Sequence, residues 1–272
     1  MSMKKVNKVL YISQEIFPYL PESEIANMGR FLPQAVQDRG RETRTFMPKF
    51  GAVNERRNQL HEVIRLSGMN LIIDDTDHPL IIKVASIQAA RMQVYFIDNE
   101  DYFHRKNTIA DENDEEYPDN DERTIFFIRG VMETVKKLRW TPDVIHCQGW
   151  MTALAPLYIK KAYNQDPFFK NSKVVYSLFD DDFKKPFREL FSERLKLEGI
   201  ENEDVAQVKD KEIDFVALTK LAIDFSDGVI QSSEKVNQKV LDYIDEKKIK
   251  FLGYQNPEDY ADDYVRFYDS LI

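Results

Sequence analysis

Short apolar runs alternate with amphipathic stretches at both ends of the chain. Residues 9–13 (VLYIS) are apolar between polar neighbours, which predicts a buried strand. Residues 24–39 place apolar side chains three and four positions apart, as on one face of a helix, and Gly40 suits the left-handed position after it. Residues 43–47 are typical of a second strand. A strand, a helix and a strand in this order predict a parallel sheet.

The middle of the chain follows a different pattern. Four short β-rich runs come in close succession, with no helical pattern between them: residues 62–67, 69–74, 80–86 and 92–97. We therefore expect antiparallel strands or hairpins at the edge of the sheet.

The α/β alternation then resumes. Expected strands are residues 143–147, 174–179 and 228–231, and expected helices are residues 123–137, 151–162, 214–225, 233–246 and 260–271. Ser233 is expected to cap its helix, and residues 181–211 are expected to be helix and loop. The predicted fold class is α/β: a Rossmann-like doubly wound parallel sheet with an antiparallel β excursion in the first half, forming one domain over residues 1–272.

Composition narrows the class of protein. The chain has 272 residues, a net charge of -9 and one cysteine, Cys147. The charge argues against nucleic-acid binding, and no apolar run is long enough to cross a membrane. Residues 1–8 do not resemble a signal peptide, so we expect a cytoplasmic protein.

The most biased segment, residues 111–122, reads DENDEEYPDNDE. Charge runs of this kind are usually solvated loops, and that is our expectation. A site for a cation or a basic partner is the alternative, but the regular ligand spacing of a calcium loop is missing.

Ligands of open parallel sheets bind at the carboxyl ends of the strands. The first such end carries Glu15, Glu22 and Glu24 and has no glycine before Gly29, so it lacks a phosphate-binding turn. These acids and Ser23 instead suit a negatively charged, capped helix N-terminus.

The strand end at residues 146–150 (HCQGW) is the best cleft candidate. His146 either faces the cleft, together with Gln148 on the same side of the strand, or is a satisfied core residue. Trp150 either stacks on a sugar ring or belongs to the core. Cys147 has no paired base and is not expected to be a nucleophile. The histidines lack metal-ligand spacing, so no metal site is expected.

Several partial motifs resemble the glycogen and starch synthases. The opening SQEIFPYLPESEIANMGRFLPQAVQDRG is similar to the family's S-x-E-x-x-P-x-x-K-T-G-G start and its L-P-x-A-L segment. YFIDNEDYF, YPDNDER, DVIHCQGWMTALAPLYIKK, VVYSLFDDDF and AIDFSDGVIQSSEKV match further family segments in order.

The resemblance implies one half of a GT-B fold, in which two Rossmann-like domains enclose the active site. We expect this chain to correspond to the first domain and the second domain to be absent. The implied ligands are a sugar nucleotide and α-glucan, without a cofactor. Family residues that survive are Glu15, Asp119, His146 and Trp150.

The departures fall in the implied cleft. The family's K-T-G-G turn, which meets the sugar nucleotide, is residues 21–24 (PESE) here, and a cleft histidine is Gln148. Candidate catalytic residues are therefore Asp119, His146 and Gln148, and candidate substrate-binding residues are Glu15, Ser23, Glu24 and Trp150.

Three hypotheses follow. The first is a catalytically impaired synthase homologue that binds sugar or α-glucan or regulates glycogen metabolism. The second is an active glucosyltransferase from ADP- or UDP-glucose to α-1,4-glucan, completed by a separate donor-domain chain. The third is an interaction module that keeps only the fold and pairs with a protein partner or with itself.

Overall fold

The computed structural model describes residues 5–209 and 212–272; expectations for residues 1–4, 210 and 211 lie outside the described residues. The strands are β1 (Lys8–Ser13), β2 (Glu42–Pro48), β3 (His61–Glu62), β4 (Met69–Ile73), β5 (Thr76–Ile87), β6 (Met92–Asp98), β7 (Val144–Gln148), β8 (Lys173–Leu178), β9 (Gly228–Gln231) and β10 (Phe251–Leu252). The α-helices are α1 (Glu24–Asp38), α2 (Glu100–Phe103), α3 (Asn120–Leu138), α4 (Leu154–Lys160), α5 (Phe191–Arg194), α6 (Phe215–Asp224), α7 (Gln238–Lys247) and α8 (Tyr260–Asp269).

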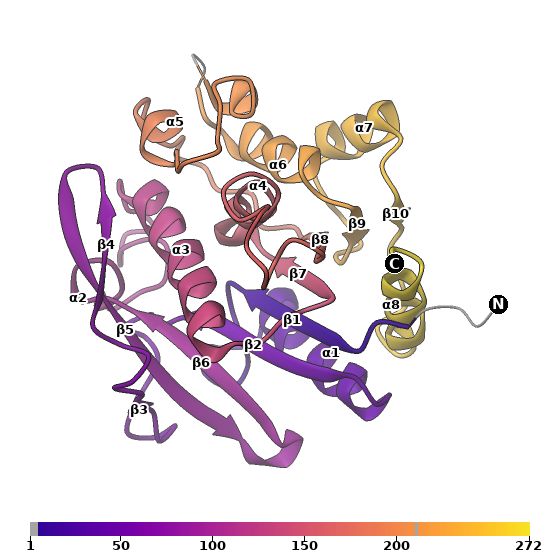
Figure 1. Cartoon of the computed structure of the whole chain (residues 1–272), viewed down its shortest axis with the longest axis horizontal. Helices are drawn as coiled ribbons and strands as arrows, with labels where there is room; N and C mark the ends of the chain where they lie inside the picture. Colours follow the sequence, from indigo (N-terminus) through magenta and orange to yellow (C-terminus); the bar gives the residue numbers. More distant parts are fainter. Residues whose placement is uncertain (1–4, 210–211) are drawn as a thin grey trace.

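The strands form one mixed sheet in the order β10-β9-β8-β7-β1-β2-β6-β5-β3, with β4 paired to β5 (Figure 1). Neighbours from β10 to β6 are parallel. β5 pairs antiparallel with β6, β4 and β3. The predicted α/β class, with a parallel centre and an antiparallel excursion, is confirmed. Strand β6 belongs to both parts, since it also pairs parallel with β2.

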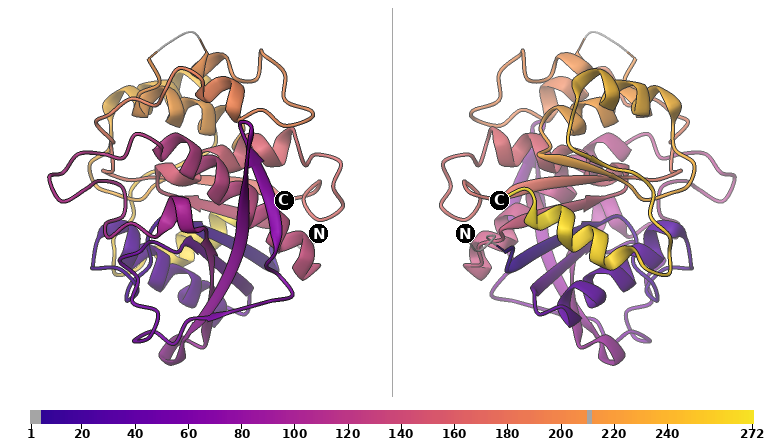
Figure 2. Two further views of the ribbon diagram at one scale, coloured as in Figure 1. Left: turned by 90° about the vertical axis from the view of Figure 1, so that its left-hand side faces the viewer. Right: turned by 90° about the vertical axis from the view of Figure 1, so that its right-hand side faces the viewer.

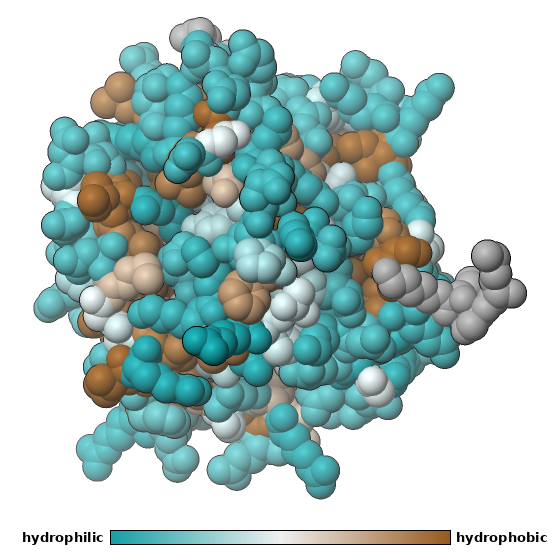
Figure 3. Space-filling view, in the orientation of Figure 1, coloured by the Kyte–Doolittle hydropathy of each residue, from teal (hydrophilic) through white to brown (hydrophobic). Residues whose placement is uncertain are grey.

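Helices cover both faces of the sheet, as in a doubly wound fold. In β1, Leu10 and Ile12 pack with the core under α3, α4 and α6, whereas Val9 and Tyr11 pack with residues of α1 and α8. This alternation follows from the two-residue period of a strand. The right-hand view of Figure 2 shows α8 lying across the sheet on its α1 side. The face shown in Figure 3 is mostly hydrophilic, with hydrophobic residues in small separate groups.

Two predicted elements are wrong in part. Of residues 62–67, only Glu62 is in a strand, because the backbone N–H groups of Leu66 and Ser67 turn back to the Val63 carbonyl. The helix expected from Ser233 begins at Gln238 and is capped by Asn237, whose side chain accepts from the Lys239 N–H.

Candidate functional site

The turn after β1 lies directly against helix α1. A Cβ atom at Gly29 would stand 2.5 Å from the Glu15 carbonyl oxygen and 2.7 Å from the Ser13 hydroxyl oxygen. Only glycine allows this approach, because real Cβ contacts of that length essentially do not occur. Gly29 therefore fixes the position of Glu15 at the carboxyl end of the sheet.

The N-terminus of α1 is closed by side chains of the protein. The Ser23 hydroxyl oxygen accepts from the Ala26 N–H at 3.0 Å and donates to Glu15 Oε2 at 2.7 Å. The Glu24 carboxylate accepts from the Ser233 hydroxyl, which also accepts from the Asp180 N–H at 3.1 Å. The predicted capping role of Ser23 is confirmed. The structure also brings Glu15, Ser23 and Glu24 together, and their role in substrate binding stays a prediction.

His146 is fully buried between the sheet and α8. Its Nδ1 lies 2.6 Å from the Tyr268 hydroxyl oxygen, and its Nε2 lies 2.5 Å from the Ser177 hydroxyl oxygen. Burial lowers the pKa of His146 to about 3, so the imidazole is neutral at physiological pH. Both ring nitrogens have protein partners, which is the geometry of a satisfied core histidine.

Gln148 follows on the same face of β7 and is also fully buried. Its amide nitrogen and oxygen have no hydrogen-bond partner among the described residues. A buried amide of this kind carries unused donor and acceptor capacity. Between them, Cys147 faces the opposite core, where burial raises the pKa of the thiol and keeps it protonated.

Trp150 has no exposed surface. Its ring packs against Phe183 at 5.1 Å and Phe187 at 5.8 Å between centroids, so the segment after β8 covers it. In this arrangement the indole offers no face to a sugar, and the role of Trp150 in binding stays a prediction.

Asp181 is a neighbour of this site that the sequence analysis did not select. Its Oδ2 accepts from the Trp150 N–H at 3.0 Å. Burial, followed by the charges of Asp182 and Glu15, raises the pKa of the Asp181 carboxyl to about 7. The signal in the sequence was the run of three aspartates directly after a buried strand.

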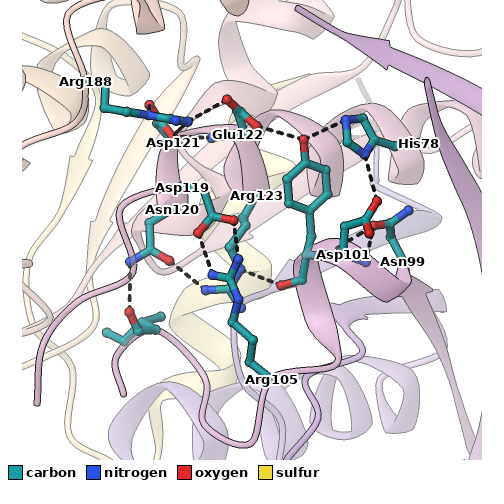
Figure 4. Close-up of polar contacts among 12 residues, drawn as sticks. His78, Asn99, Asp101, Arg105, Asp119, Asn120, Asp121, Glu122, Arg123 and Arg188 are labelled. Carbon is teal, nitrogen blue, oxygen red and sulfur yellow. Dashed lines mark hydrogen bonds and ion pairs between the residues drawn. The ribbon is translucent and has the colours of Figure 1, made fainter. Parts of the chain in front are cut away.

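Asp119 belongs to a separate network at the N-terminus of α3 (Figure 4). Its two carboxylate oxygens each lie 2.5 Å from an Arg105 guanidinium nitrogen, a bidentate ion pair. The buried Arg123 guanidinium lies beside this pair and bonds the carbonyl oxygens of Tyr102 and Thr108 and the Asn120 side chain. Asp119 thus has a structural partner, and its catalytic role stays a prediction.

The expectation that residues 111–122 form a solvated loop is wrong at the C-terminal end of this segment. Residues 120–122 begin α3, and Asp121 is buried. Arg188 bonds both Asp121 and Glu122, and Arg194 bonds Glu122 at 2.8 Å. Glu116 also accepts from the N–H groups of Lys184 and Lys185. The acidic segment therefore binds a basic segment of its own chain.

Within residues 5–209 and 212–272, no three His, Cys, Asp or Glu side chains lie close enough to hold a metal ion. Across the same residues, no helix has the length and apolarity to span a membrane.

A sheet with a parallel centre and helices on both faces places the protein in the class of Rossmann-like domains. Comparison with known families narrows this class. The family model for the starch synthase catalytic domain matches residues 8–252, and the chain belongs to that family.

Individual relatives agree. The chain is 39% identical to a glycogen synthase of Chlorobium limicola over 172 residues, which are 63% of this chain and 35% of the relative. It is 35% identical to a glycogen synthase of Chlorobaculum tepidum over 237 residues, or 86% of this chain and 47% of the relative. The chain thus spans less than half of these curated relatives.

A solved structure shares the fold. The catalytic domain of starch synthase IV from Arabidopsis thaliana, bound to ADP and acarbose, superposes with a TM-score of 0.73 at 17% identity. The match covers 93% of this chain and 52% of that chain. Helix α8 lies beyond the residues that the family model matches, yet it completes the core around His146.

Proposed function

We propose that this protein is a synthase-type domain that binds sugar or α-glucan but does not transfer glucose from a sugar nucleotide. The observation that carries this proposal is the closed N-terminus of α1, where Ser23 caps the helix and Glu15 and Glu24 stand beside it.

A diphosphate binds at a helix N-terminus through free backbone N–H groups and the positive end of the helix dipole. Here the Ala26 N–H already bonds Ser23, and Glu24 already occupies the first turn. Unlike charges at 4 Å attract by about 1–4 kcal/mol near a protein surface, and like charges repel by as much. Pro21 in place of the family's lysine, together with the added carboxylates of Glu22 and Glu24, therefore opposes the binding of a sugar nucleotide.

A neutral glucan meets no such repulsion. Carboxylates such as those of Glu15 and Glu24 accept hydrogen bonds from sugar hydroxyls. The acidic edge that disfavours a diphosphate is compatible with a chain of hydroxyl groups.

Two measurements on the whole chain test the proposal. Incubation with radiolabelled ADP-glucose or UDP-glucose and glycogen is expected to incorporate no label, and sedimentation with glycogen is expected to retain the protein. Incorporation by the purified protein overturns the proposed loss of activity. Incorporation only after addition of cell lysate favours an enzyme completed by a separate donor-domain chain. Failure to sediment with glycogen overturns the glucan-binding part.

A further inference from the structure

A groove runs along α1 on the side that faces α8. Its first part is a hollow of about 350 Å³ between α1 and residues 253–260, the segment that leads into α8. An adjoining hollow of about 430 Å³ shares Phe31, Pro257 and Tyr260 with the first and continues to Arg39 near the end of α1. The groove is therefore elongated and open along its length.

Aromatic rings line the shared part of the groove. Phe31 is 47% exposed and Tyr254 is 37% exposed, although most large apolar side chains of the protein are buried. The Arg30 guanidinium carbon lies 5.0 Å from the centroid of the Phe31 ring, and Tyr260 packs edge-to-face on Tyr264 at 5.4 Å. These contacts hold the rings of Phe31 and Tyr260 in place. The exposed fractions of Phe31 and Tyr254 leave ring surface open to the groove.

Polar groups stand among the rings. The first hollow is lined by Glu24, Asn27 and Gln255, and the residues that line it include no lysine or arginine. The Gln255 amide nitrogen bonds the Gly253 carbonyl oxygen at 2.8 Å, which orients its amide. The first hollow thus offers a carboxylate and amides for hydrogen bonding but no positive charge for a phosphate. In the second hollow Arg39 stands beside Asp38, Glu258 and Asp259, so acids outnumber the one base.

We infer that this groove binds a neutral α-glucan chain, with glucose rings stacked on Phe31, Tyr254 and Tyr260. The apolar C–H faces of a pyranose fit aromatic rings, and its hydroxyls fit carboxylate and amide groups. Two hollows in line suit a chain of rings better than one compact ligand. The inference rests on the proposed glucan binding and assigns it a site on the α1–α8 surface in addition to the cleft.

Calorimetric titration of the full chain with maltoheptaose tests the site. The double variant Phe31→Ala/Tyr254→Ala is expected to weaken binding at least tenfold. Both side chains are exposed, so the fold is expected to survive, and circular dichroism with thermal unfolding checks this. Phe251→Ala is the matched control, because Phe251 is also 37% exposed and does not line the groove. Its affinity is expected to stay within twofold of the unaltered chain.

The outcomes separate the two proposals. If the double variant binds maltoheptaose as well as the unaltered chain, the groove assignment is overturned and the proposed glucan binding stands. If the unaltered chain binds neither maltoheptaose nor glycogen, both are overturned. Equal binding of cellohexaose, or displacement of maltoheptaose by tetramethylammonium, overturns the assignment to α-glucan, since the site would then recognise any pyranose chain or an organic cation.

Discussion

The Nδ1 atom of His146 lies 2.6 Å from the hydroxyl oxygen of Tyr268. This contact joins the central strand β7 to α8, and Ser177 on β8 occupies the other ring nitrogen. Burial lowers the pKa of His146 to about 3. The histidine therefore acts as a neutral link in the core.

This link predicts a loss of stability in acid. Between pH 6.5 and about 3 the unfolded chain binds a proton at this histidine and the folded chain does not, so stability falls as the pH falls. From pH 6.5 to pH 4 the loss from this residue is up to about 3 kcal/mol. Urea unfolding of His146→Gln is expected to show lower stability at pH 7 and a smaller loss towards pH 4. His61→Gln, at an exposed position, is the control and should leave the slope unchanged.

The close approach of α1 to the turn after β1 predicts that alanine substitution destabilises the protein much more at Gly29 than at Gly253. Gly29→Ala places a methyl group 2.5 Å from the Glu15 carbonyl oxygen and is expected to cost about 2–3 kcal/mol. Gly253→Ala meets no atom within 4 Å and is expected to change stability by less than about 0.5 kcal/mol. Chemical denaturation of both variants measures the difference, and equal costs would contradict the close packing.

The cap at Ser23 predicts a moderate effect. Ser23→Ala removes the acceptor of the Ala26 N–H and the donor to Glu15, and should destabilise the protein by about 1 kcal/mol. Glu22→Ala, one residue earlier and exposed, is the control with little expected change. Thermal unfolding compares the two, and a neutral Ser23→Ala variant is incompatible with the cap.

The buried carboxyl of Asp181 predicts a loss of stability as the pH rises, whereas His146 predicts a loss as the pH falls. Its folded pKa of about 7 lies above the ordinary value, so the folded chain is favoured while the carboxyl is protonated, and this advantage disappears as the pH rises from about 4 through 7. Asp181→Asn keeps an acceptor for the Trp150 N–H and cannot ionise. Its melting temperature relative to the unaltered chain is expected to rise by a few °C, roughly, between pH 5 and pH 8.5. A constant difference would show that Asp181 is ionised throughout.

The ion pairs of Arg188 predict that this side chain anchors residues 181–196, the segment after β8, to helix α3. Arg188→Ala removes bonds to Asp121 and Glu122, so limited proteolysis within residues 181–196 is expected to accelerate several-fold. Lys184→Ala removes only the exposed pair with Asp114 and should leave the cleavage rate near that of the unaltered chain. Equal rates for the two variants would mean that the aromatic contacts with Trp150 alone hold the segment.

Local patterns predicted the fold well, because the strands and helices of this α/β class are recognisable from the spacing of apolar residues that are close together in the sequence. The roles of the site residues could not be predicted in this way, because they depend on contacts with residues that are far apart in the sequence. His146 stayed open in the sequence because Tyr268 and Ser177, which satisfy it, come from other elements. Ser233 looked like a helix cap, but its hydroxyl bonds Glu24, 209 positions away. The burial of Trp150 was hidden for the same reason, since Phe183 and Phe187 reach it only after the chain folds.

The position of β1 also bears on how the protein is made. β1 is translated before β7, yet it lies between β2 and β7, and Val9 pairs with Val144. At typical elongation rates, roughly 7–27 s pass between the synthesis of these two residues. Throughout that interval one edge of an apolar strand has no neighbour on the nascent chain. The nascent chain thus exposes an unpaired, aggregation-prone strand edge. Ribosome-associated chaperones are suited to shield this edge until the later strands are synthesised.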